Sequence, residues 1–347
     1  MRAPFALLIG AAAVLRPVAA QAPAPVKVVT SLTTYGAIAR DIVGDRGVVT
    51  AIANAAENPH FVQPKPSFVP LLGGADLFVT TGLDLELWVP ALLDKAGNPR
   101  VSEGGPGYVA AHEGIPLLEV PTNFSRTQGD IHVFGNPHIW TDPLNAIQIA
   151  RNILAGLRRV APAHDAYFTA REKDFEERIN RALFGEDLVK ILGAETLVKL
   201  DRDGKLFEFL RAQRYQGAPL IDRLGGWLKQ GLPFRGREVA CYHKDWDYFS
   251  RQFAMPCFGY VEPKPGIPPT PRHVQEIITA MREKKIPVLL SNTYYDRRQV
   301  QELAQRTGAT AVIVPANTGS GADTYIALVD LWMDALGRAF APTASPE

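Results

Sequence analysis

The chain has 347 residues, of which 46% are hydrophobic and 21% are charged; this apolar content can fill a packed core and excludes a disordered chain. The 37 Lys and Arg residues almost balance the 36 Asp and Glu residues, so no basic excess indicates a nucleic-acid partner. Two cysteines are too few for a disulfide-rich scaffold or a four-thiolate zinc module.

The chain begins with the pattern of a secretory signal peptide. Arg2 precedes an apolar run over residues 5–15, and small residues follow at Ala19 and Ala20. The run is too short for a membrane span, which needs about 20 apolar residues. No cysteine follows it, so we expect no lipid anchor there. We therefore expect residues 1–20 to be a signal peptide cleaved after Ala20, and the mature protein to be periplasmic.

Short β-branched runs alternate with helical stretches in the next part of the chain. We predict strands at residues 26–30, 47–52, 75–81 and 116–120, and helices at 34–43, 68–72 and 85–96. Strands separated by helices are typical of parallel βαβ units. Residues 21–142 are therefore expected to form an N-terminal α/β lobe.

A long helical pattern occupies the middle of the chain. Apolar residues recur at helical spacing from Asp142 to about residue 183, with a break at Pro162, and predict a linking spine helix over residues 143–182. Asp142 is the expected N-cap of this helix. Residues 183–235 hold many large apolar side chains, so we expect an inserted, mainly helical segment that folds. The sequence leaves open whether this insert is a decorative subdomain or a partner surface.

Strands and helices alternate again over residues 236–340, which predicts a C-terminal α/β lobe followed by a tail at 341–347. The expected strands are 238–242, 257–261, 287–291 and 311–314, and the expected helices are 245–253, 271–283, 297–307 and 323–340. Cys241 and Cys257 lie on two successive strands. The sequence leaves open whether they form a disulfide or stay as two buried thiols.

Three histidines, His60, His138 and His243, lie in loops next to predicted strands or turns. The first two follow an Asn-Pro pair, and proline restricts the backbone that presents each imidazole. Imidazole is the commonest metal donor, and ligands of parallel α/β sheets gather where loops leave the strands. The gaps of 138 − 60 = 78 and 243 − 138 = 105 residues exceed those of any local zinc motif. Only the fold could therefore bring these residues into one site.

These residues resemble those of the periplasmic metal-binding proteins of ABC importers, which capture zinc or manganese. The matching stretches are residues 57–60, 64–67, 136–143, 241–249 and 321–325. The resemblance extends from Val26 to about Arg338. It implies an α/β fold of two lobes, each with a small parallel sheet and flanking helices. One long spine helix would join the lobes, and the metal site would lie in the cleft between them.

The resemblance also implies the metal ligands His60, His138, His243 and Asp323. Three nitrogens and a carboxylate form a closed, roughly tetrahedral set, which favours capture over hydrolysis. Manganese-preferring members tend to carry a carboxylate where this chain has His243, so we expect Zn²⁺, with Mn²⁺ or Fe²⁺ as alternatives. The implied protein is a monomeric receptor, not an enzyme. It would deliver zinc to an inner-membrane ABC permease, with a periplasmic metallochaperone as a further candidate partner.

Many zinc-binding members of this group carry a His-rich loop before the second ligand. Here residues 111–135 hold only His112 and His132, which we expect to be surface residues. Two rival functions remain. A secreted zinc hydrolase would need an open coordination position and a general base, for which Glu57 is the only candidate. A metal-stabilised adhesin or scaffold would use the metal only to fold.

Overall fold

The structure is a computed structural model that describes residues 24–121, 132–319 and 321–341. The predicted signal peptide and residues 342–347 of the predicted tail lie outside the described residues. Within the described residues, no helix has both the length and the apolar character that crossing a bilayer requires.

The N-terminal lobe is built on a parallel sheet of four strands in the order β2-β1-β3-β4. The strands are β1 (Val26–Thr30), β2 (Gly47–Ala51), β3 (Leu77–Thr80) and β4 (Tyr108–Ala110), and the intervening helices are α1 (Thr33–Val43), α2 (Phe68–Gly73) and α3 (Val89–Ala96). Every residue of β3 is buried, as expected for a parallel strand covered on both faces. The first three predicted strands are thereby confirmed.

The strand predicted at residues 116–120 is wrong, because the fourth strand of the sheet is β4. Glu119 lies within the predicted run and has a φ of 52°, a left-handed backbone conformation that a strand does not accommodate. Pro116 also removes one backbone donor from this run. The apolar residues between them gave the segment the composition of a strand without its geometry.

The connection after the first lobe is a pair of helices, α4 (Pro143–Val160) and α5 (Asp165–Phe184), instead of the single spine helix expected. The two helices pack against each other and against α1. The chain turns at Pro162, which has no N–H to continue the helical hydrogen bonds. As predicted, Asp142 caps α4: its carboxylate accepts a hydrogen bond from the Leu144 N–H at 2.8 Å.

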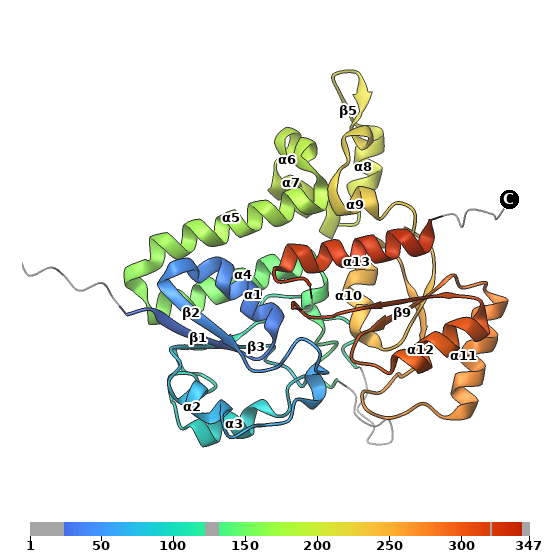
Figure 1. Cartoon of the computed structure of the whole chain (residues 1–347). Helices are drawn as coiled ribbons and strands as arrows, with labels where there is room; N and C mark the ends of the chain where they lie inside the picture. The colour runs from blue at the N-terminus through green and yellow to red at the C-terminus, as the bar shows by residue number, and fades with distance from the viewer. Residues whose placement is uncertain (1–23, 122–131, 320, 342–347) are drawn as a thin grey trace, which may run out of the picture.

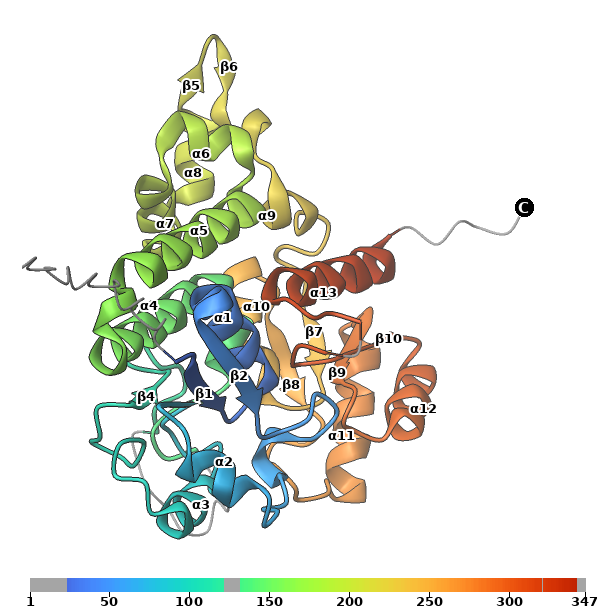
Figure 2. The same cartoon turned by 60° about the vertical axis from the view of Figure 1, so that its left-hand side comes forward.

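Residues 185–235 form a mainly helical projection. It contains the helices α6 (Glu186–Leu192), α7 (Ala194–Arg202), α8 (Leu206–Ala212) and α9 (Gly226–Gln230), with the strand pair β5 (Arg214–Tyr215) and β6 (Ala218–Pro219). Figure 1 and Figure 2 show it standing above α5, with the β5–β6 hairpin at its tip. Leu197, Leu210 and Trp227 are buried inside it. The large apolar residues of this segment therefore form a core.

The C-terminal lobe contains a second parallel sheet of four strands, in the order β10-β9-β7-β8. Its elements are β7 (Val239–Cys241), α10 (Asp247–Phe253), β8 (Cys257–Tyr260), α11 (Pro271–Glu283), β9 (Val288–Asn292), α12 (Arg297–Thr307), β10 (Thr310–Val314) and α13 (Tyr325–Phe340). Cys241 and Cys257 form a disulfide with their Cα atoms 5.6 Å apart. The bond joins β7 to its neighbour β8 just before His243.

The two lobes share one hydrophobic core and do not form separate bodies. A single cluster of buried residues includes strands β1 and β3 of the first lobe and β7, β9 and α13 of the second. Trp140 donates a hydrogen bond from Nε1 to the Ala316 carbonyl at 2.8 Å, and the Tyr325 hydroxyl donates to the Trp140 carbonyl at 2.7 Å. Because buried contacts join the lobes, we expect local loop motion and not a wide hinge.

Candidate metal centre

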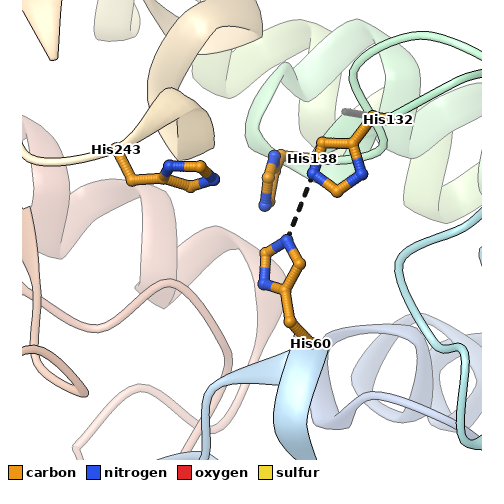
Figure 3. Close-up of side chains that lie close together, drawn as sticks. All are labelled: His60, His132, His138 and His243. Atoms are coloured by element: carbon orange, nitrogen blue, oxygen red, sulfur yellow. Dashed lines mark hydrogen bonds between the residues drawn. The ribbon is translucent and has the colours of Figure 1, made fainter. Parts of the chain in front are cut away.

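Four histidines converge where the two lobes meet. One ring nitrogen each of His60, His132, His138 and His243 lies within 4.8 Å of the other three (Figure 3). His60 comes from the turn after β2, and His132 and His138 come from the segment before α4. His243 follows β7 in the second lobe. Residues far apart in the sequence therefore form one nitrogen-lined centre.

Every one of the four imidazoles is held through its Nδ1 atom. The acceptors are Asn58 Oδ1 for His60 (2.8 Å), Asp84 Oδ1 for His132 (3.2 Å), Asn136 Oδ1 for His138 (2.9 Å) and the Glu262 carbonyl for His243 (2.6 Å). Each acceptor requires a proton on Nδ1, and a neutral imidazole then has its lone pair on Nε2. The surrounding oxygens thus fix the same tautomer in all four rings and leave four Nε2 atoms as ligands.

The four Nε2 atoms have few partners of their own within the described structure. Those of His138 and His243 are buried and have no hydrogen-bond partner. The Nε2 atoms of His60 and His132 lie 3.3 Å apart and point toward each other, a contact in which one of the two rings can donate to the other (Figure 3). Zn–N bonds of about 2.0–2.1 Å place the nitrogens of a tetrahedral site about 3.3 Å apart. A cation at the centre of this set would satisfy all four nitrogens once the rings that now lie up to 4.8 Å apart draw closer.

Burial keeps three of these histidines, His60, His138 and His243, in the form that binds metal. Burial and the neighbouring His243 and His132 hold the pKa of His60 well below its usual value. Burial and the neighbouring rings also hold the pKa of His138 well below its usual value. Burial lowers the pKa of His243 to about 4. Neutral rings do not have to lose a proton from Nε2 before a cation binds.

Asp245 places a buried carboxyl group beside the four rings. Its Oδ1 atom lies 3.1 Å from His138 Nε2, an approach that lacks hydrogen-bond geometry. The same carboxyl accepts a hydrogen bond from the Tyr294 hydroxyl at 2.9 Å. Burial raises the pKa of Asp245 to about 7. A divalent cation nearby favours the ionised carboxylate, which then offsets part of the cation's charge.

The two Asn-Pro-His turns are built in the same way. In each turn the Asn side chain accepts from the backbone N–H of the histidine two residues later, at 3.1 Å for His60 and 3.0 Å for His138. The same Asn oxygen also accepts from the ring Nδ1–H, so one side chain fixes both the backbone and the imidazole. Trp88 further holds the first turn through a 2.9 Å hydrogen bond from Nε1 to the Pro59 carbonyl. The repeated motif is therefore a device for orienting a ring.

The structure brings together three of the four residues named from the sequence. Asp323 does not join His60, His138 and His243: its side chain is exposed just before α13, and the metal-competent group found among the described residues does not contain it. Glu57 is also outside this group, and its carboxylate accepts from the Asn54 N–H at 2.9 Å.

The fourth ring belongs to His132, which the sequence analysis assigned to the surface. That expectation is wrong, because only 12% of the His132 side chain is exposed and its Nδ1 contacts Asp84. The sequence signal that could have identified His132 as a ligand is its position only six residues before His138. His112, from the same loop region, is instead engaged with the Thr81 carbonyl at 2.8 Å.

The sequence profile described as "Zinc-uptake complex component A periplasmic" (ZnuA) matches residues 28–183 and 194–339. The chain belongs to the ZnuA family. Members of this family are substrate-binding components of ABC transporters, and this ZnuA-family chain is a metal-binding substrate-binding protein of that type.

Relatives of this ZnuA-family chain differ in the metal that they are named for. The iron-binding protein YfeA of Yersinia pestis is 26% identical over 345 residues, covering 97% of this chain and 93% of the relative. The manganese-binding lipoprotein MntA of Halalkalibacterium halodurans is 23% identical over 308 residues, covering 86% and 83%.

Solved structures confirm the two-lobed α/β fold. A crystal structure of ZnuA superposes with a TM-score of 0.65 at 16% identity, covering 91% of this chain and all of that chain (100%). A Mn-bound periplasmic metal-binding protein from Candidatus Liberibacter asiaticus gives a TM-score of 0.64 at 17% identity, covering 90% and 98%. At these identities the likeness establishes the fold and not the choice of metal.

Proposed function

We propose that this ZnuA-family protein is a periplasmic receptor that captures Zn²⁺ and delivers it to an inner-membrane ABC permease. The proposed ligands are His60, His132, His138 and His243. The observation that carries this proposal is the convergence of four Nε2 atoms, each in a ring anchored through Nδ1.

The donor set supports zinc over manganese. Imidazole nitrogen suits Zn²⁺, Fe²⁺ and other later first-row ions, whereas Mn²⁺ is better matched by carboxylate and water oxygens. The metal-competent group among the described residues has four nitrogens and no carboxylate oxygen. Four nitrogens within 4.8 Å also suit a tetrahedral ion, and zinc has no preference for a larger coordination number in closed sites.

The same donor set supports carriage over catalysis. A catalytic zinc usually keeps three protein ligands and one open position for water or substrate. Four histidine nitrogens fill a tetrahedral zinc, and Glu57, the base proposed for a hydrolase, is outside the group. The extensive core that surrounds the centre also supports a protein that stays folded without metal, unlike a metal-dependent scaffold.

The burial of the rings indicates the route of the cation. His138 and His243 are fully buried, whereas His60 and His132 are partly exposed. A pocket of about 50 Å³ lies beside the outer pair and is also lined by Phe61, Asp84 and Leu87. Zinc would enter from this pocket, contact His60 and His132 first, and settle on the buried pair. The signal-peptide pattern and the disulfide support a location outside the cytoplasm.

The test is a competition titration of the metal-stripped mature protein against a coloured chelator, with Zn²⁺, Fe²⁺ and Mn²⁺ in turn. We expect one equivalent of Zn²⁺ to bind, much more tightly than Mn²⁺. His138→Ala should lose most of this affinity, and the matched control His164→Ala, which changes a histidine outside the centre, should keep it. Tighter binding of Mn²⁺ or Fe²⁺, or full zinc affinity in His138→Ala, would contradict the proposal.

A further inference from the structure

A second cavity is lined by different residues from those of the four-histidine centre. It has a volume of about 430 Å³, within the roughly 300–1,000 Å³ typical of small-molecule sites. Its walls come from α7 and α8 of the helical projection and from α10 of the C-terminal lobe. None of the four proposed metal ligands lines this cavity.

The cavity is lined by three guanidinium groups. Arg202 and Arg251 both contact one carboxylate oxygen, Asp142 Oδ2, at 3.2 and 3.3 Å. The second oxygen of Asp142 is already engaged by the Leu144 N–H. Two positive charges thus share one buried negative charge. Arg202 also donates from its second terminal nitrogen to Asn145 Oδ1 at 3.0 Å. The side chains of Arg202 and Arg251 remain 34% and 39% exposed, so their remaining N–H bonds can reach a molecule in the cavity.

The third guanidinium group, that of Arg235, forms no ion pair within 4 Å among the described residues, although burial lowers its pKa and the Asp201 carboxyl is near enough to raise it against that effect. Its central carbon lies 3.8 Å above the Phe207 ring, and no ion pair or side-chain hydrogen bond is found for it among the described residues. Stacking on an aromatic face fixes the plane of the group and leaves its N–H edge unused. Asp201 also lines the cavity and accepts from Gln252 Nε2 at 2.9 Å. Even with Asp201 and Asp142 both ionised, the three arginines leave an excess of one positive charge.

We propose that this cavity binds a small dicarboxylate. One carboxylate of the ligand pairs with the planar edge of Arg235, and the other reaches the free N–H groups of Arg202 and Arg251. Arginine matches a carboxylate with two parallel hydrogen bonds, which gives such a pair its strength and orientation. Pro116, Leu206 and Phe207 supply an apolar wall for the carbon atoms between the two carboxylates. A small inorganic anion would leave this wall unused.

A ligand bound here would stabilise the contact between the projection and the C-terminal lobe. Arg202 lies on α7, Arg251 lies on α10, and Arg235 is the last residue of the projection, four residues before β7. A ligand that binds only the folded state stabilises it by RT ln(1 + [L]/Kd), so the unfolding temperature rises with the logarithm of ligand concentration above Kd. Dicarboxylate binding therefore has a readout that does not depend on zinc.

The experiment uses succinate, a weak chelator, with the metal-stripped mature protein at constant ionic strength. Calorimetric titration should show one bound succinate per chain, and thermal unfolding should shift upward with succinate concentration. Arg235→Gln should weaken succinate binding by about tenfold or more and leave zinc affinity unchanged. The matched control Arg223→Gln, an arginine of the same projection that does not line the cavity, should change neither.

Arg235→Lys keeps the charge and loses the planar edge, so it should also weaken binding, and it replaces Arg235→Gln if that variant does not fold. The proposal is overturned if no heat of binding appears up to about 10 mM succinate, because a dissociation constant above that concentration is too weak for a specific site of this size. Unchanged affinity in both Arg235 variants overturns it as well. Tighter binding of inorganic phosphate than of succinate overturns the assignment to dicarboxylates.

Discussion

The strongest test of the proposed centre is the replacement of His132 by alanine. His132 is the ligand that sequence reasoning missed, and it takes the place of a carboxylate, Asp323, that the resemblance implied. Its removal takes one nitrogen from the centre and breaks the contact with Asp84. The His132 side chain is not fully buried, with 12% of it exposed, so the fold should tolerate the change.

The size of the effect follows from the number of ligands. Four-ligand structural zinc sites have apparent binding free energies of about 10–16 kcal/mol, or about 2.5–4 kcal/mol for an equal share per ligand. Water takes the vacant position in the variant and recovers part of this share. A net loss of about 2–3 kcal/mol corresponds to roughly 30- to 150-fold weaker zinc binding, since about 1.4 kcal/mol is tenfold.

The assay is competition with a chelator of known zinc affinity, because a direct titration saturates when binding is tight. Two variants serve as matched controls. Asp323→Ala removes the exposed carboxylate, and His112→Ala removes the other histidine from the same loop region. Both should keep the zinc affinity of the parent protein. A zinc affinity of His132→Ala within about threefold of that of the parent protein would refute the four-histidine centre. A loss of zinc affinity in Asp323→Ala as large as the loss expected for His132→Ala would refute it as well.

Three further predictions address the supports of the centre and the fold. Asn58→Ala, which removes the Nδ1 acceptor of His60, should weaken zinc binding about 10- to 100-fold in the same competition assay, and unchanged affinity would contradict the role assigned to that hydrogen bond. Reduction of the Cys241–Cys257 bond, which closes a loop of 16 residues, should lower the free energy of unfolding by about 3 kcal/mol in urea titrations, and an unchanged midpoint would count against it. Burial and nearby Glu119 raise the pKa of Asp247 to about 8, so the folded state holds a proton that the unfolded chain loses near pH 4. Stability should therefore fall as the pH rises from about 4 to 8, and Asp247→Asn should flatten this dependence in thermal unfolding scans at several pH values.

The sequence predicted the secondary structure well where local patterns decide it. The helices predicted at residues 271–283 and 297–307 match α11 and α12, because Pro271, Asp296 and Gly308 mark their ends. The error at residues 116–120 arose where composition and backbone conformation disagree. The run is apolar, but Glu119 has a positive φ, and no pattern of hydrophobicity reports that.

The centre was only partly predictable for a related reason. Each Asn-Pro-His turn contains its own orienting device, so His60 and His138 could be singled out from a few neighbouring residues. His132 has no such local motif, since its Nδ1 acceptor is Asp84, 48 residues away in the sequence. Only tertiary structure reveals a pair of this kind. Asp323 presents the opposite case, because a matching stretch of sequence did not bring its side chain into the group.

The burial of the four rings suggests how one rigid molecule could both hold and release a cation. His138 is tied to the C-terminal lobe through its turn, since the Tyr248 hydroxyl donates to the Asn136 carbonyl at 2.7 Å. His243 is held from the same lobe by the Glu262 carbonyl. Because both lobes share one core, this inner pair cannot separate without loss of buried packing.

The outer pair is held differently. His60 and His132 are partly exposed and are anchored by residues of the first lobe, Asn58 and Asp84. Movement of these two loops would take two of the four nitrogens from the metal and leave the shared core intact. Under the proposed function, release would then require the loss of half of the coordination without opening the lobes, and a docked permease would act on the surface that carries His60 and His132.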